Sequence, residues 1–186
     1  MSKLIEVQQS QSTLDDASLI ANAILLVFGG HETTTNLIGN GWLTLKQHPE
    51  QLDKLDNHLS TAVEECLRFE SPFQRIGRVS TQPITLGDIQ IRANHRILLI
   101  LSAANRDPAI FQHPNQFTIT RSDNAHIAFG HGIHLCPGAA LSRLEAKIAF
   151  SLLKKRLHHW QLVDTTPAWQ PNLGLRGMLT CPLQAI

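Results

Sequence analysis

The sequence contains no tyrosine and only three cysteines among its 186 residues. Cys66, Cys136 and Cys181 are an odd number and lie far apart in the chain, so there is no Cys-x-x-Cys redox or zinc pair. This pattern argues against a disulfide framework and is typical of a reducing compartment. We therefore expect a cytoplasmic protein in which at most one cysteine takes part in chemistry.

An excess of charge and a long apolar run are also missing. The 16 Lys and Arg residues nearly balance the 15 Asp and Glu residues, which argues against a nucleic-acid partner. The longest unbroken apolar run is 23–28, whereas a membrane span needs about 20 residues. The first residues contain no apolar signal core, and we expect no membrane span.

What remains is the composition of a globular protein, with 42% hydrophobic and 17% charged residues. We expect a flexible N-terminal segment over 1–12 and a single domain over 13–186. Hydrophobic spacing predicts helices over about 13–47, 49–59, 60–70 and 138–158. Alternation with a period of two predicts short strands over 76–80, 84–86, 89–91 and 96–101. The predicted fold class is mainly α with small β-sheets.

A pair of glycines, Gly29 and Gly30, lies in the middle of the longest predicted helix. Each glycine weakens a helix by roughly 1 kcal/mol relative to alanine. The presence of two glycines in a helix therefore calls for a structural explanation. Either the helix backbone must be accessible at this point, or the glycines mark a kink. The spacing alone leaves both interpretations open.

Glycines also surround Cys136, where a long irregular stretch becomes the last helix. The run 129–138 reads Phe-Gly-His-Gly-Ile-His-Leu-Cys-Pro-Gly. Unpaired N–H groups at a helix N-terminus favour a thiolate, and glycines let a flat or bulky group approach the backbone. The pattern predicts a cysteine that binds a ligand.

Other interpretations of Cys136 are open at this point. Zinc could bind it together with His126, His131 and His134, although this spacing is not a usual structural zinc pattern. Cys136 could be a catalytic nucleophile served by a distant histidine. It could also be a buried cysteine in a turn, but a plain turn does not explain the crowding glycines.

The run 129–138 resembles the haem-binding signature of the cytochrome P-450 family, Phe-Gly-x-Gly-x-His-x-Cys-x-Gly. Further segments match that family in the same order, namely Gly29-Gly30-His31-Glu32-Thr33-Thr34, Glu65-Cys66-Leu67-Arg68, Arg78 and Asn105-Arg106-Asp107-Pro108. The resemblance covers roughly 13–184, and His134 is typical of the soluble bacterial type. Because family members are about twice as long, the chain is similar to the C-terminal half of the cytochrome P-450 fold, and we expect a truncated haem-binding domain.

The resemblance implies how the chain would hold haem b. Cys136 would be the axial thiolate ligand and the only metal ligand from the protein, and Phe129 would shield its sulfur. Arg78 and His134 would pair with the haem propionates. The glycines that would let the haem approach the backbone are Gly30, Gly130 and Gly138.

The resemblance also implies roles for two further pairs. Thr33 would hydrogen-bond dioxygen, and Glu32 would relay protons as the second catalytic residue. Glu65 and Arg68 would form a buried structural pair that braces the cysteine loop. Taken without the resemblance, their spacing of i and i+3 indicates only a surface pair worth under about 1 kcal/mol.

One position departs from the family pattern. The family often has an arginine where this chain has Gln116, and that arginine normally joins the carboxylate–guanidinium network of the Glu-x-x-Arg motif. A glutamine carries no charge. The network therefore requires Arg121 or His113 to take the place of the missing arginine.

The implied function is that of a haem-thiolate monooxygenase, an iron oxidoreductase that uses dioxygen and two electrons to oxidise a small apolar molecule. Its electron donor would be a ferredoxin or a flavoprotein reductase. Basic residues on the last helix, such as Arg143 and Lys147, indicate either a solvated face or a docking surface for that donor. The alternative is a truncated non-catalytic haem-binding protein or an inactive gene remnant.

Overall fold

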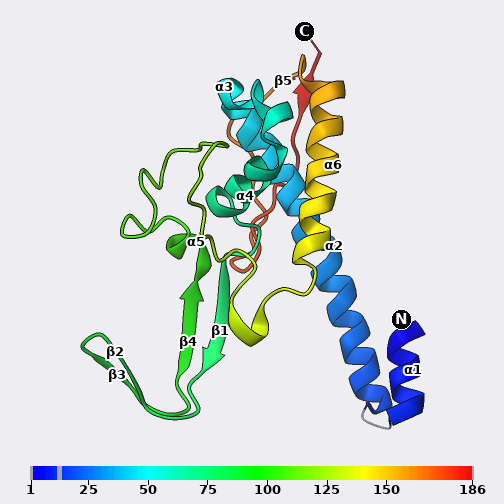
Figure 1. Cartoon of the computed structure of the whole chain (residues 1–186), viewed down its shortest axis with the longest axis vertical. Coiled ribbons are helices and arrows are strands. Elements are labelled where there is room, and N and C mark those ends of the chain that lie inside the picture. Colours follow the sequence, from blue (N-terminus) through cyan, green and yellow to red (C-terminus); the bar gives the residue numbers. More distant parts are fainter. Residues whose placement is uncertain (1, 12–13, 186) are drawn as a thin grey trace.

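Helices make up most of the regular secondary structure, and small two-stranded sheets lie beside them (Figure 1). This computed structural model describes residues 2–11 and 14–185. The helices are α1 (Ser2–Gln11), α2 (Asp16–Gln47), α3 (Pro49–Leu52), η1 (Leu55–Asn57), α4 (Leu59–Phe69), α5 (Leu101–Ala104), η2 (Gly132–His134) and α6 (Ala139–Leu157). The strands are β1 (Arg75–Val79), β2 (Ile84–Leu86), β3 (Ile89–Ile91), β4 (Arg96–Ile100), β5 (Gln161–Leu162) and β6 (Leu183–Gln184).

Helix α2 is the longest element, and its ends follow from local chemistry. Asp15 is the N-cap and accepts a hydrogen bond from the Ser18 amide (2.7 Å). Thr13, where we expected the helix to begin, lies outside the described residues. At the other end His48 is the C-cap, directly before Pro49, because a residue that precedes proline is disfavoured in a helix.

The N-terminal half of α2 extends away from the other helices, and only α1 lies beside it (Figure 1). The helix continues without a break through Gly29 and Gly30, and a Cβ at either position would meet nothing within 4 Å. Apolar side chains here are exposed, by 49% at Phe28 and 73% at Val27. The glycine pair therefore lies in an accessible stretch of helix. No helix in the described ranges combines the length and the apolar character that crossing a bilayer requires.

The first twelve residues, which we expected to be a flexible segment, contain helix α1. Leu4, Val7 and Gln8 lie on one face of α1 and are half-buried. The side-chain amide of Gln8 donates to Asp16 at the start of α2 (2.6 Å). This contact joins α1 to α2, and local sequence does not reveal it.

The hydrophobic core lies between the C-terminal half of α2, α4 and α6 (Figure 1). Gly41 allows these helices to approach closely, since a Cβ there would lie 2.5 Å from the Phe150 ring and 3.1 Å from the Cys66 sulfur. Overpacking of this kind costs about 1–3 kcal/mol in a core. Position 41 must therefore stay without a side chain for the three helices to meet.

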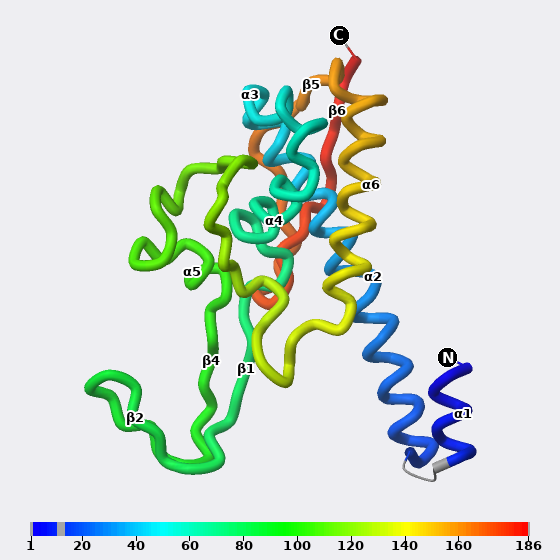
Figure 2. The backbone as a smooth tube through the Cα atoms, viewed as in Figure 1, coloured from blue at the N-terminus to red at the C-terminus, as the bar shows by residue number. Residues whose placement is uncertain are grey.

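Strand β1 pairs antiparallel with β4, which places Val79 opposite Arg96. Strands β2 and β3 form a hairpin at the end of the molecule farthest from the core (Figure 2). All four predicted strands form, with ends that differ by at most one residue. The single helix predicted over 49–59 is wrong, because α3 ends at Leu52 and a turn separates it from η1.

Candidate functional site

The loop before α6 presents the Cys136 side chain at a helix start. Gly130 (φ +75°) and Gly132 (φ +68°) adopt left-handed backbone conformations that favour glycine. The Cys136 amide donates to the Phe129 carbonyl oxygen (2.9 Å), which closes the loop. Gly138 is the N-cap of α6, and a Cβ there would lie 3.8 Å from the Cys136 sulfur.

The three cysteines differ in how far they can react. Cys66 is fully buried in the core, and burial raises the pKa of its thiol. Burial also raises the pKa of the half-buried Cys181. Cys136 is half-buried and is the cysteine that follows the glycine loop and precedes a helix N-terminus. These environments make Cys136 the cysteine best placed to bind a ligand.

A cavity of about 490 Å³ lies between the β1–β4 sheet and the cysteine loop. It is lined by Arg78 and Arg96 from the two strands and by His134 from the loop, together with Gly77, Val79, Ile97 and Leu98. The lining contains two guanidinium groups and one imidazole but no carboxylate, so it suits an anionic group. The structure thus places Arg78 and His134, to which the resemblance gave a shared role, around one cavity.

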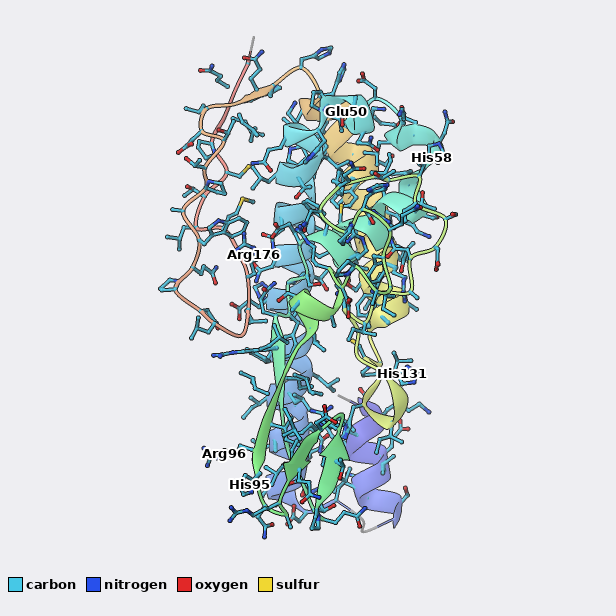
Figure 3. The ribbon with its side chains drawn as sticks, turned by 90° about the vertical axis from the view of Figure 1, so that its left-hand side faces the viewer. Glu50, His58, His95, Arg96, His131 and Arg176 are labelled. Atoms are coloured by element: carbon cyan, nitrogen blue, oxygen red, sulfur yellow. The ribbon has the colours of Figure 1, made fainter. Side chains whose placement is uncertain are left out.

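Arg96 was not among the residues expected from the sequence. It is exposed at the start of β4, toward the hairpin end of the molecule (Figure 3). Cross-strand register places it near Arg78, because Arg78 lies opposite Ile97. The sequence signal was a predicted strand that begins with arginine, but its partner strand was not known.

Glu32 and Thr33 are half-buried near the middle of α2 and do not line this cavity. The Thr33 hydroxyl donates to the Gly29 carbonyl oxygen (2.8 Å), one turn earlier in the helix. The neighbouring Thr34 hydroxyl donates to Ser142 (3.2 Å) and thus links α2 to α6. The Gly30 backbone is accessible beside these groups.

The Glu65 carboxylate is completely buried and is paired with two arginines. Arg68, also completely buried, donates to both of its oxygens (2.8 Å each). Arg121 donates to Oε2 (3.1 Å), and the Thr118 amide donates to Oε1 (2.9 Å). Arg121 therefore supplies the cation that Gln116 lacks.

Arg68 in turn holds the irregular segment that leads to the cysteine loop. Its guanidinium donates to the carbonyl oxygens of Asn105 (3.0 Å), Pro114 (2.8 Å) and Gln116 (3.1 Å). Gln116 thus joins the network through its backbone. Buried charges are tolerated only when they are paired in this way.

The preceding residue, Glu64, forms a second network at the cysteine loop. Arg143 of α6 donates to both carboxylate oxygens (2.7 and 2.8 Å), and His126 contacts Oε2 (3.0 Å). Burial opposes ionisation of Glu64, but hydrogen bonds from His126 and Arg143 lower its pKa to about 2. The hydrogen bond with the Glu64 carboxylate in turn raises the pKa of Arg143, although burial opposes this.

The structure bears on two interpretations that the sequence left open. The Arg143 guanidinium is bound by Glu64 and lies over the Phe129 ring, and 36% of its side chain stays exposed. His126 faces Glu64, and among the described residues no three His, Cys, Asp or Glu side chains gather as a metal site. The structure therefore does not bring His126, His131, His134 and Cys136 together as the zinc ligands considered from the sequence.

These features fit a haem better than the other ligands considered. A half-buried cysteine at a glycine-framed helix start offers a sulfur ligand, and Arg78, Arg96 and His134 offer hydrogen-bond donors for carboxylates. Exposed apolar side chains of the loop, such as Ile133 (97%), suit a flat apolar group. The residues present thus match the chemistry of an anionic porphyrin with one sulfur ligand.

Comparison with known proteins gives one consistent family. The family model for cytochrome P450 matches residues 57–175. The biotin biosynthesis cytochrome P450 of Bacillus subtilis (strain 168) is 45% identical over 178 residues, which are 94% of this chain and 45% of that protein. Cytochrome P450 monooxygenase PikC of Streptomyces venezuelae is 41% identical over 93% of this chain and 43% of its own length.

Solved structures agree with the sequence relatives. P450BioI in complex with an acyl carrier protein ligated to hexadec-9Z-enoic acid has a TM-score of 0.90 and 43% identity, over 97% of this chain and 47% of that one. Tirandamycin C-bound P450 monooxygenase TamI has a TM-score of 0.94 and 38% identity, over 98% of this chain and 47% of that one. The chain spans about half the length of the curated relatives it matches.

Removing the buried carboxylate should destabilise the fold strongly. We expect Glu65→Ala to lower the free energy of unfolding by roughly 3–5 kcal/mol, because it leaves the Arg68 charge buried without its partner. Urea unfolding followed by circular dichroism measures this change. The control is Glu50→Ala at an exposed position, and a Glu65→Ala variant as stable as that control would contradict a bracing role.

Glu64 should make stability depend on pH in the acid range. Its folded-state pKa of about 2 is below the ordinary value of 4.5, so the unfolded chain binds the proton first as the pH falls. The stabilisation is full above about pH 4.5 and is lost between about pH 4.5 and 2. In Glu64→Gln this contribution is absent throughout, so the stability difference between parent and variant should shrink on acidification. A difference that stays constant from pH 6 to pH 2.5 would contradict the prediction.

Proposed function

Because the chain belongs to the cytochrome P450 family and has the fold of its C-terminal part, we propose that it is the haem-binding part of a bacterial haem-thiolate monooxygenase. The observation that carries this proposal is the glycine-framed Cys136 at the start of α6, beside a cavity lined by Arg78, Arg96 and His134. Family membership implies haem, and we propose haem b as the form. When bound, the haem supplies activation of dioxygen with two electrons and transfer of one oxygen atom to an apolar substrate.

Different residues of this chain would contact the two faces of the haem. On one face the Cys136 thiolate would bind the iron, and Phe129 would cover the sulfur. At the edge, Arg78 and His134 would bind the propionates, and Arg96 would add a third cationic group. The backbone at Gly130 and Gly138 would allow the haem to approach closely.

On the other face, α2 would provide the groups that handle dioxygen and protons. Thr33 would leave its hydrogen bond to the Gly29 carbonyl oxygen and donate toward dioxygen. Glu32, its half-buried neighbour, would carry protons from solvent. The accessible backbone at Gly30 would leave space for dioxygen and for the groups that carry protons.

We propose a small apolar molecule as substrate and a ferredoxin or flavoprotein reductase as electron donor. Support for the substrate class comes from the ligands named for similar structures, which include a fatty acid on an acyl carrier protein, corticosterone and testosterone. These ligands differ in shape but share an apolar body. The rival proposal is a non-catalytic haem-binding protein, which the exposed apolar surface of α2 favours.

Replacing the proposed ligand should abolish haem binding through sulfur. We expect Cys136→Ala to lose most of its haem and the thiolate-type band of its carbon-monoxide complex, because no other side chain offers a thiolate there. Cys181→Ser and Cys66→Ala are the controls and should keep both. Haem content and a carbon-monoxide spectrum unchanged in Cys136→Ala would show that Cys136 is not the ligand.

These 186 residues expressed alone should be a poor monooxygenase even with haem bound. Substrate positioning accounts for about 7–11 kcal/mol of a barrier, and the exposed face of α2 provides no wall to hold a substrate or exclude water. With electrons from a ferredoxin system and a panel of terpenes, fatty acids and steroids, hydrogen peroxide should far exceed hydroxylated product. Thr33→Ala should change this ratio little. Tightly coupled hydroxylation of any panel member would contradict the prediction.

A further inference from the structure

Glu64 is the centre of a set of contacts that ends at Cys136. Its carboxylate receives two parallel hydrogen bonds from Arg143, Nε to Oε1 (2.7 Å) and Nη2 to Oε2 (2.8 Å). This fork arrangement fixes the plane of the guanidinium as well as its distance. Glu64 lies on α4, whereas Arg143 lies on the second turn of α6. The pair therefore fixes the start of α6 relative to the core.

The fixed guanidinium holds Phe129, at which the cysteine loop begins. The Arg143 guanidinium carbon lies 4.6 Å from the centroid of the Phe129 ring, within the range of a cation–π contact. The Phe129 carbonyl oxygen accepts the hydrogen bond from the Cys136 amide (2.9 Å). A continuous line of contacts thus runs from Glu64 through Arg143 and Phe129 to Cys136.

His126, three residues before Phe129, provides a second connection between Glu64 and the start of the cysteine loop. Its Nδ1 accepts a hydrogen bond from the Ala128 amide (3.2 Å), so the ring proton is on Nε2, which donates to Glu64 Oε2 (3.0 Å). Its ring centroid lies 6.2 Å from that of Phe129. Glu64 therefore holds Phe129 from two sides, through an arginine and a histidine.

We infer that Glu64 is a positioning residue for the bond between haem iron and the Cys136 sulfur. It acts on the cysteine loop through Arg143, His126 and Phe129. This inference rests on the haem-thiolate function proposed above. Outer contacts of this kind orient a metal ligand, and their loss typically costs 10–100-fold in metal affinity or activity. Without the Glu64 charge the guanidinium loses its anchor, the Phe129 backbone loosens, and the sulfur is held less firmly.

Glu70 provides a matched control at the end of the same helix. The Glu70 side chain is 20% exposed, against 27% for that of Glu64, and it also pairs with two arginines, Arg106 and Arg176. Within the described residues, neither of those arginines forms a hydrogen bond or an ion pair with the cysteine loop. Glu70→Gln therefore removes a comparable charge network without acting on Cys136.

The test compares haem loss and the carbon-monoxide spectrum in the parent, Glu64→Gln and Glu70→Gln. We expect Glu64→Gln to release haem to an apo-globin acceptor about 10-fold faster than the parent. Its carbon-monoxide complex should shift part of its intensity from the thiolate-type to the thiol-type band. Glu70→Gln should match the parent in both measurements, and equal changes in the two variants would overturn the inference.

Arg143→Lys decides the question if Glu64→Gln does not fold. It keeps a positive charge beside Glu64 but loses the fork and the contact with the Phe129 ring, so haem loss should again be faster and the thiol-type band should again appear. A folded Arg143→Lys protein with the haem-loss rate and spectrum of the parent would overturn the inference. If the parent itself shows no thiolate-type band, the proposed haem-thiolate function fails, which is a separate result.

Discussion

The Glu65 carboxylate is buried completely in the core and must be paired, and this requirement fixes the irregular segment that leads to the cysteine loop. The segment from Asn105 to the cysteine loop has few regular elements of its own. It is ordered because Arg68 and Arg121 neutralise Glu65 and because Arg68 also binds three backbone carbonyl groups of that segment. Breaking a pair of this kind leaves an uncompensated charge in the interior, which is far more costly than losing a surface pair.

Glu64, the residue before Glu65 on α4, is also a paired carboxylate, and its partners lie at the cysteine loop. Glu64 and Glu65 are neighbours on α4, so their side chains point in different directions. Glu65 orders the segment that approaches the loop, and Glu64 holds the loop itself through Arg143 and His126. Two adjacent carboxylates on one rigid helix thus connect the core to Cys136.

Much of this molecule could be predicted from local sequence, and what could not depends on long-range pairing. The end of α2 before Pro49, the four strands and the glycine-framed Cys136 all follow from local patterns. Helix α1 was not predicted, and its contact with Asp16 of α2 is one that the local pattern does not show. Arg96 was missed because only the β1–β4 register brings it to Arg78 and His134, and the partners of Arg143 were missed because they lie on other elements. The family resemblance supplied residue roles and the Glu65–Arg68 pair, but the partners of Glu64 required the structure.

The central claim is that Cys136 binds haem iron through its sulfur, and X-ray absorption at the iron edge tests it most directly. The haem-loaded chain is measured beside its Cys136→Ala variant reloaded with haem. The account predicts one sulfur ligand on the iron in the parent and none in the variant. A parent iron site surrounded only by nitrogen and oxygen would contradict it.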